Sequence, residues 1–329
     1  MMVGAFIGIL ILGWVLGKNN LANLFGTAVG TRMVHLRTAE VLALAFVAIG
    51  AFLSGGATTS SVLSLSDLQT PMDIIVILVS AVIVMDILSR LGIPASIVQT
   101  ILGGITGWNI CRYTHIDWDL VKNILKAWIW APIIAAGISF GLMKIVRKSL
   151  ASHPISLIKR DLILRISLIM AGVLASYTLG ANNIGTITGP FLSVFKTFSP
   201  VGITAAVCAA IGIGFLMANK RVIETIGRKL FPLSPTEGLV VMMGSALSMI
   251  FFSMESIRNI LIFCHLPTLP LVPIPMSNVM IGSIVGISVA KGGYGLKYAV
   301  LGRILMSWFI VPVVAGGLSF LLLTLGNLL

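Results

Sequence analysis

The segment LGANNIGTITGPF, residues 179–191, places two adjacent asparagines, two threonines and three glycines inside otherwise apolar sequence. Residues 17–30, GKNNLANLFGTAVG, interrupt the N-terminal apolar stretch in nearly the same way. Both segments read Gly-x-Asn-Asn, then an apolar and a small residue, and each has a glycine nine residues after its first. A polar motif that recurs inside hydrophobic sequence indicates a duplicated chain with hydrogen-bonding groups buried in both copies.

The composition of the chain indicates a membrane protein. Hydrophobic residues make up 57% of the 329 residues and charged residues 10%, whereas soluble domains carry about 25% charged residues. Apolar runs such as 72–91 and 304–327 have the length of about 20 residues that a helix needs to cross a bilayer. Residues 1–17 lack a basic start and a small-residue cleavage site, so we interpret them as a retained helix. We predict an all-α, polytopic membrane protein.

The net charge of +12 is consistent with two kinds of partner. Nucleic acid is one, but the basic clusters contain no interleaved aromatic residues. The other is the cytoplasmic side of a membrane, where loops carry an excess of Lys and Arg. We favour the second and expect no nucleic-acid partner. The clusters are Lys144, Arg147, Lys148, Lys159, Arg160 and Arg165, and then Lys220, Arg221, Arg228 and Lys229.

A second pair of segments also indicates duplication. Residues 92–107, GIPASIVQTILGGITG, and 272–286, VPIPMSNVMIGSIVG, each begin with proline near a polar residue. Each continues as a helix that is rich in small residues and short for a full membrane span. We predict a first repeat at 1–146, a basic cytoplasmic linker at 147–161 and a second repeat at 162–329.

Loop charges indicate that the two repeats have inverted topology. Residues 55–70 contain no Lys or Arg, whereas their counterpart 219–236 contains four, which places the two loops on opposite sides. Inversion requires an odd number of crossings per repeat, yet each half has six apolar segments. Some helices should therefore be broken or re-entrant. We expect the breaks at the polar motifs, meeting at a midplane anion site. The alternative is that the motifs only hold helices together.

At these residues the chain resembles the inorganic phosphate transporter (PiT) family. The duplicated family signature reads approximately Gly-Ala-Asn-Asp-Val-Ala-Asn-Ala-x-Gly, and it aligns with residues 17–26 and 180–189. The family's Pro-x-Ser-Thr-Thr-His element matches residues 94–99, and more loosely 273–278. The resemblance covers nearly the whole chain. It implies a secondary transporter of an inorganic oxyanion in the plasma membrane of a prokaryote.

The chain departs from the family pattern at its charged positions. Asn20 and Asn183 replace the signature aspartates, and Lys18 stands where the family usually has alanine. Hard cations such as sodium need anionic or carbonyl oxygen ligands, so these changes argue against the usual sodium site and leave proton coupling as an expectation. Two threonines, a histidine and a glutamate of the family pattern are replaced at Ile97, Val98, Gln99, Val47 and Met242.

Hydrogen-bond chemistry favours sulfate over phosphate at such a site. Phosphate near neutral pH keeps a proton that a carboxylate can accept, whereas a carboxylate repels fully deprotonated sulfate. Amides, hydroxyls and backbone N–H groups donate to sulfate without repulsion. The PiT family includes a sulfate permease branch with similarly altered signatures, and the chain resembles that branch most. The alternatives are a phosphate symporter and a passive anion channel.

The candidate substrate-binding residues come from both signatures and both proline-containing elements. They are Lys18, Asn19, Asn20, Asn23, Ser96, Gln99, Asn182, Asn183, Thr186, Ser277 and Asn278. Two interpretations of Lys18 stay open, because its ammonium can face the anion or extend to water. The expected partners are sulfate or phosphate and the lipid bilayer, and a homodimer is left open.

Other reactive side chains do not form a recognisable site. Cys111, Cys208 and Cys264 have no spacing typical of a disulfide or a metal site, so no metal and no cofactor are expected. We expect a transporter and not an enzyme, because the histidines form no catalytic motif; they are His35, His115, His153 and His265. Two acid–base pairs have helical ion-pair spacing; they are Asp86 with Arg90 and Glu255 with Arg258.

Overall fold

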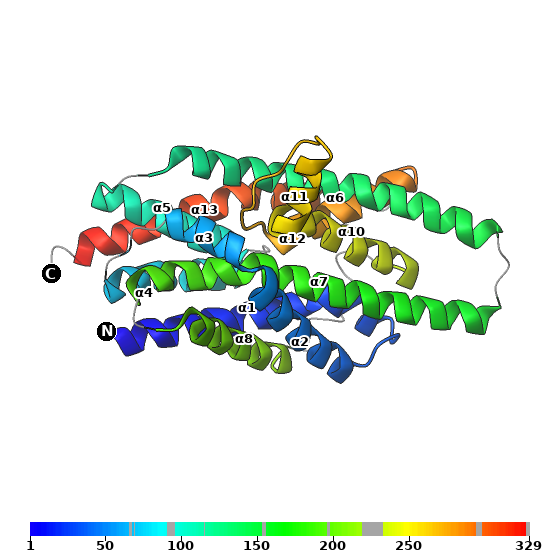
Figure 1. Cartoon of the computed structure of the whole chain (residues 1–329), viewed down its shortest axis with the longest axis horizontal. Helices are drawn as coiled ribbons and strands as arrows, with labels where there is room; N and C mark the ends of the chain where they lie inside the picture. The colour runs from blue at the N-terminus through cyan, green and yellow to red at the C-terminus, as the bar shows by residue number, and fades with distance from the viewer. Residues whose placement is uncertain are drawn as a thin grey trace.

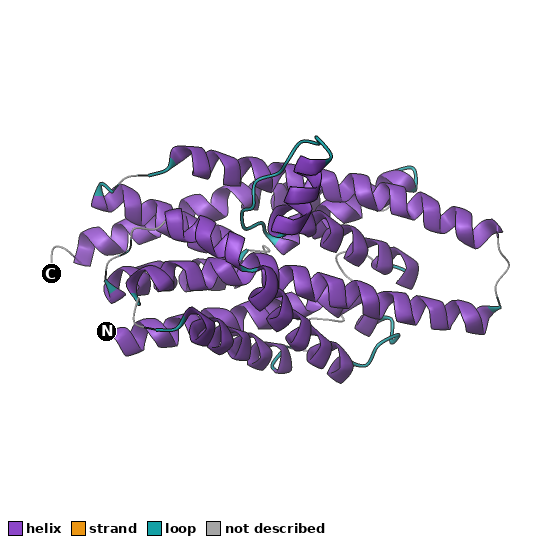
Figure 2. Ribbon diagram, in the orientation of Figure 1, coloured by secondary structure: helices purple, strands orange, loops and turns teal. Residues whose placement is uncertain are grey.

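The computed structural model describes residues 1–65, 68, 70–90, 96–114, 116–152, 156–195, 198–218, 233–293 and 298–326. All regular secondary structure in these residues is helical, which confirms the predicted all-α class (Figure 2). The helices are α1 (Met2–Gly30), α2 (Leu36–Ser54), α3 (Gly56–Leu65), α4 (Pro71–Arg90), α5 (Ile97–Arg112), α6 (Trp118–Ser152), α7 (Leu157–Val194), α8 (Pro200–Leu216), α10 (Pro235–Ser253), α11 (Glu255–Phe263), α12 (Met276–Ala290) and α13 (Tyr298–Gly326).

Seven of the described helices are long and apolar enough to cross a membrane, namely α1, α2, α4, α6, α7, α10 and α13. Their exposed side chains include large apolar ones, as Val313 and Phe309 of α13 illustrate. Several of their buried side chains are polar, such as Thr178 and Ser245. Apolar surface outside and paired polar groups inside are what a hydrocarbon solvent requires. The chain is a multi-pass membrane protein, as predicted.

Helices from the two halves of the chain pack on one another in matching pairs. α1 packs on α8 and α2 on α7, while α5 packs on α13 and α12 on α6. Glycine makes two of these contacts close. A Cβ at Gly103 of α5 would overlap the carbonyl oxygen of Pro312 in α13, and one at Gly282 of α12 would overlap that of Pro132 in α6. Small residues permit this approach of helix backbones in a membrane.

Two antiparallel helix hairpins, α4–α5 and α10–α12, occupy corresponding places in the two halves. The first turn of α4 meets the end of α5, where Trp108 Nε1 donates to Asp73 Oδ1 at 2.9 Å. The first turn of α10 meets the end of α12, where Lys291 Nζ lies 2.6 Å from Glu237 Oε1. α5 has 16 residues and α12 has 15, or about 24 and 22 Å of helix. Both are shorter than the hydrocarbon core of about 30 Å.

The hairpin ends that carry Asp73 and Glu237 lie at opposite ends of α6. The chain leaves α5 and enters α6 within a few residues, at Trp118. Near the other end of α6, Arg147 donates to the carbonyl oxygen of Ala290, the last residue of α12, at 3.3 Å. α6 has 35 residues, or about 52 Å. The start of α1 and the end of α13 lie at one end of the molecule, and the end of α6 and the start of α7 lie at the other (Figure 1).

Much of the predicted linker 147–161 is helical. Residues 147–152 extend α6 and 157–161 begin α7, whose N-cap Ser156 accepts a hydrogen bond from the backbone N–H of Lys159. Of the basic loop predicted at 219–236, residues 219–232 lie outside the described part of the chain.

The expectation that helices break at the polar motifs is wrong. α1 and α7 run continuously through both signatures, because their polar side chains can bond within the same helix. Asn20 Nδ2 donates to the carbonyl oxygen of Leu16 at 2.9 Å, and Thr188 Oγ1 to that of Ile184 at 3.1 Å. A described stretch of irregular backbone instead precedes α12, after α11 ends at Phe263.

Candidate functional site

Asn182 connects the second signature to the irregular segment before α12. Its side chain is completely buried. Its Oδ1 accepts a hydrogen bond from the backbone N–H of Ile274 at 2.7 Å, and its Nδ2 donates to the carbonyl oxygen of Val272 at 3.2 Å and to Ser253 Oγ at 3.3 Å. Non-helical backbone inside a membrane protein needs such partners. The structure therefore commits the Asn182 amide to holding this segment and the end of α10 against α7.

Asn183 and Thr186, on the same helix, are buried without full hydrogen bonding. Only 3% of Asn183 and none of Thr186 is exposed. No described residue bonds to Asn183 Oδ1 or Thr186 Oγ1. A buried polar atom without a partner costs about 1–3 kcal/mol, and its presence in a folded protein requires an explanation such as a bound ion or water.

The first turn of α12 carries a third unpaired group. Asn278 is fully buried, and its Nδ2 has no partner among the described residues. Ser277, which is half-buried, lies 3.4 Å through its Oγ from Asn278 Oδ1. Ile274, which Asn182 holds, lies one helical turn before Asn278 in sequence. The free backbone N–H groups of a helix start attract anions, so the Asn278 amide adds a side-chain donor to a favourable position.

More of the polar side-chain atoms in the first signature have hydrogen-bond partners within that signature. Asn23 Nδ2 donates to Asn20 Oδ1 at 3.2 Å, and Asn20 Nδ2 is already bonded to Leu16. In the aligned second signature, Asn183 and Thr186 occupy the same two places and leave both oxygens unpaired. The two copies therefore differ, and the second offers more free hydrogen-bonding capacity.

The 94–99 element contributes two described candidates. Ser96 is the N-cap of α5, and its side chain makes no capping hydrogen bond to a described residue. Gln99 is buried, with Nε2 at 3.4 Å from the carbonyl oxygen of Trp308 in α13. That bond directs the Gln99 amide toward a neighbouring helix. Pro94 and Ala95 lie outside the described residues.

Lys18 and Asn19 do not join the buried groups. Both side chains are exposed, and Lys18 Nζ lies 5.1 Å from the centre of the Trp14 ring, one turn earlier on α1. The neighbouring Gly17 takes the buried position against α8, where a Cβ would overlap the carbonyl oxygen of Ile211. Successive helix residues point about 100° apart, so burying Gly17 turns Lys18 outward. Of the two interpretations of Lys18, the structure supports the one in which the ammonium extends away from the anion site.

The polar groups of α7 are closed off in this conformation. A cavity of about 10 Å³ touches Thr186 between α7, α4 and α5, which is about the room that one water needs. Its other lining residues are apolar, Ile74 and Ile101 among them. An oxyanion that bonds to Thr186 would need the surrounding helices or the segment before α12 to move.

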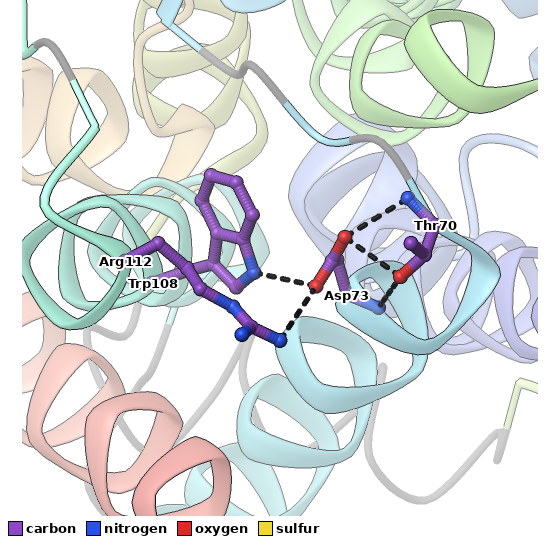
Figure 3. A network of polar contacts seen from close by, with 4 residues as sticks. All are labelled: Thr70, Asp73, Trp108 and Arg112. Carbon is purple, nitrogen blue, oxygen red and sulfur yellow. Dashed lines mark hydrogen bonds and ion pairs between the residues drawn. The ribbon is translucent and has the colours of Figure 1, made fainter. Parts of the chain in front are cut away.

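Within the described ranges, the buried charged side chains are Asp73 and Glu237. Figure 3 shows the first of them: Asp73 Oδ1 lies 2.9 Å from Trp108 Nε1 and 3.6 Å from Arg112, and Oδ2 accepts from the hydroxyl and backbone N–H of Thr70. Both acids stand in the first turn of a helix, away from the signatures. The unpaired groups of Asn183, Thr186 and Asn278 are thus electrically neutral.

Sequence reasoning missed these two ionic networks. The only signal was a capping-box pattern, in which Thr70 precedes Asp73 by three residues and Ser234 precedes Glu237 by three. The partners Arg112 and Lys291 lie too far along the chain to be inferred.

The two ion pairs predicted from helical spacing have different outcomes. Glu255 and Arg258 are both described, and no ion pair joins them. The i+3 spacing brings the two residues to one helix face, but exposed ion pairs gain little over hydration. That prediction is wrong. The Arg90 side chain, the predicted partner of Asp86, lies outside the described residues.

Comparisons with known proteins agree on one family. The model of the phosphate transporter family matches residues 16–258. A "Putative phosphate permease" of Methanocaldococcus jannaschii is 25% identical, over 94% of this chain and 92% of its own length. The sulfate permease CysP of Bacillus subtilis is also 25% identical, over 94% and 84%. A solved structure titled "The sodium-dependent phosphate transporter" has a TM-score of 0.82 at 18% identity, covering 100% of this chain and 99% of that one, and so shares the fold.

Proposed function

The chain belongs to the phosphate transporter family, and from that premise we propose that it is a secondary transporter whose substrate is sulfate and whose cycle does not require sodium. Membrane transport of an inorganic anion follows from the family. The choice of sulfate and the absence of sodium coupling rest on the residues of this chain.

One observation carries the proposal. Asn183 Oδ1, Thr186 Oγ1 and Asn278 Nδ2 are buried without partners on α7 and on the first turn of α12. Together they would leave roughly 3–9 kcal/mol of hydrogen bonding unmade if nothing bound to them. Thr186 and Asn278 can donate as they stand, and the Asn183 amide can rotate to present Nδ2 instead of Oδ1. These are groups that a tetrahedral oxyanion can use.

The charge of the groups favours sulfate. The signature aspartates of the family are Asn20 and Asn183 here, and the described buried carboxylates, Asp73 and Glu237, have their own bonding partners. Amide and hydroxyl oxygens are weaker hydrogen-bond acceptors than a carboxylate, so a site without a carboxylate suits an anion that has no proton to donate. Monohydrogen phosphate carries an O–H that needs an acceptor, and leaving that donor unpaired is costly.

The same replacements argue against sodium. Sodium, like other hard cations, is held by oxygen ligands, and carboxylates are the strongest of these. Replacing an aspartate by asparagine in each signature removes two negative charges. Lys18 adds nothing to this change, because its side chain is exposed. The downhill flow of another ion must then drive accumulation, and protons are the candidate that we favour.

The matched helix pairs support two inverted repeats at 1–146 and 162–329. The first turn of α4 meets the end of α5 at Asp73 and Arg112, and the first turn of α10 meets the end of α12 at Glu237 and Lys291. These two hairpin ends lie at opposite ends of α6, as an inverted pair requires. If the 147–161 linker is cytoplasmic, the Asp73 end faces outward and the Glu237 end inward.

Phosphate is the second candidate substrate. The observation in its favour is that the identity to the "Putative phosphate permease" of M. jannaschii equals that to the sulfate permease of B. subtilis. Accumulation by purified protein in liposomes separates the two candidates. We expect labelled sulfate to accumulate when choline replaces sodium and a proton gradient is imposed. Accumulation of phosphate alone, or passive equilibration of sulfate that no gradient drives, would refute the proposal.

A further inference from the structure

A polar pocket of about 550 Å³ opens on the surface beside the first turns of α6. Its walls come from α3, α6, α11 and residues 268–272, and its polar lining includes Ser60, Asn123, Glu255 and Arg258. Glu255 and Arg258 are exposed to solvent. This pocket contains none of the predicted substrate-binding residues.

The floor of the pocket is the segment that Asn182 holds. Leu271 and Val272 line the pocket. On the pocket side, Ser61 Oγ donates to the carbonyl oxygen of Leu271 at 2.7 Å. On the other side, the carbonyl oxygen of Val272 accepts from Asn182 Nδ2. A single stretch of irregular chain therefore separates the pocket from Asn182 of the second signature.

Arg258 is positioned to receive an anion. No described carboxylate lies within ion-pair distance of its guanidinium, and Glu255 on the same helix is unpaired likewise. The guanidinium fork matches two oxygens of an oxyanion at once. Asn123, on the facing helix, can supply a further N–H. Glu255 adds a negative charge that weakens the attraction.

We propose that this pocket is an outer binding site for the transported oxyanion, in which Arg258 captures the anion before the 268–275 segment moves and admits it to Asn183 and Thr186. This inference rests on the proposed transport function. It assigns to Arg258 the positive charge that the buried groups lack, at a place where water can share the cost of desolvation. On the orientation proposed above, the start of α6, which lines the pocket, faces outward.

The first test is uptake kinetics. Arg258→Gln is expected to raise the KM for sulfate about tenfold, since it removes a charge-assisted hydrogen bond, with kcat retained. The KM of Arg258→Lys should lie between the values of the wild type and Arg258→Gln, and Glu255→Gln should lower KM. Lys122→Gln is the matched control, because Lys122 is an exposed cation on α6 that pairs with Asp119 and is not part of the pocket lining. It should leave KM unchanged.

The second test measures occupancy directly. In a Cys264→Ser background, Ser60→Cys is modified with a membrane-impermeant thiol reagent, and sulfate is expected to slow the reaction. Ser64→Cys is the control, because Ser64 is exposed on the same helix and is not part of the pocket lining. Sulfate should not protect it.

If KM is unchanged in Arg258→Gln and sulfate gives Ser60→Cys no protection while the wild type transports sulfate, the outer site is wrong and the transport proposal stands. If the wild type transports no oxyanion, the transport proposal itself fails.

Discussion

Lys291 Nζ and Glu237 Oε1 lie 2.6 Å apart, joining the end of α12 to the first turn of α10. Arg112 and Asp73 join the end of α5 to the first turn of α4 in the same way, at 3.6 Å. In each hairpin the acid also belongs to a helix cap, with Ser234 or Thr70 as the N-cap residue. The two ionic contacts therefore hold together the open ends of both hairpins, where the first turn of one helix meets the end of the other.

Breaking the Glu237–Lys291 contact should destabilise the protein. Lys291→Met leaves the Glu237 carboxylate buried with only its capping bonds, and we expect a loss of about 1–3 kcal/mol, because hydrogen bonds to charged groups are worth about that much. Thermal unfolding in detergent measures it. Lys159→Met, at an exposed position on α7, is the control. An unchanged melting temperature in Lys291→Met would show that the contact is incidental.

Adjacent asparagines should respond in opposite ways. Asn182→Ala removes three hydrogen bonds that hold residues 272–274 and Ser253, so it should destabilise the fold by about 2–4 kcal/mol. Asn183→Ala removes an unpaired group and should leave stability unchanged or improved. Asn183→Ala should weaken the binding of sulfate about 5- to 150-fold. Melting temperatures and uptake KM values for both variants check this. Wild-type affinity for sulfate in Asn183→Ala would mean that the motif only packs helices together and does not bind the anion.

Thr186→Val tests the same idea with a nearly isosteric change. The variant removes a buried hydroxyl that has no described partner, so we expect higher thermal stability together with slower sulfate uptake. Thr188→Val is the control, since the Thr188 hydroxyl bonds to the carbonyl oxygen of Ile184. A Thr186→Val variant that loses stability would mean that the hydroxyl has a structural partner.

Lys18→Met should leave sulfate uptake unchanged. The Lys18 ammonium lies over the Trp14 ring on the outside of α1, and the contact is worth about 0.5–1 kcal/mol at an exposed site. A small fall in melting temperature is therefore the whole expected effect. A large rise in KM would place the ammonium at the anion after all.

Cysteine labelling tests the inverted arrangement. In a Cys264→Ser background, Lys122→Cys lies beside the α4–α5 end of α6, and Lys148→Cys beside the α12 end. We expect an impermeant reagent to reach the first from outside the cell and the second only from the cytoplasm. Labelling of both positions from one side would refute the proposed topology.

Composition and motif repetition were sufficient to predict the helical membrane fold and to select Asn183, Thr186 and Asn278. They could not predict which amide would be satisfied. Asn182 and Asn183 are identical in chemistry, and they differ only because the first faces residues 272–274. Such a difference depends on the rotation of α7 against its neighbours, which no local pattern encodes.

The sequence also could not predict that α1 and α7 run without a break through the two signatures. Asparagine can terminate a helix or bond to the carbonyl oxygen four residues earlier, and Asn20 does the latter. The outward direction of Lys18 could have been inferred, because Gly17 beside it is suited to close helix contact. The Glu237–Lys291 contact joins residues that are 54 positions apart in the chain, so the sequence indicated only the helix cap that Glu237 forms with Ser234.

Binding of a fully deprotonated dianion by neutral donors at Asn183 and Thr186, without sodium, is the core of the proposed function. Its most direct test is the initial uptake of sulfate and phosphate by the wild type, Asn183→Ala and Asn183→Asp, with sodium present or replaced by choline. We predict wild-type sulfate uptake that is equal in both salts. Asn183→Asp should lose more sulfate uptake than Asn183→Ala while phosphate is affected less, because the new carboxylate repels sulfate but can accept the proton of phosphate. Strict sodium dependence, or phosphate uptake that sulfate does not compete for, would contradict the account.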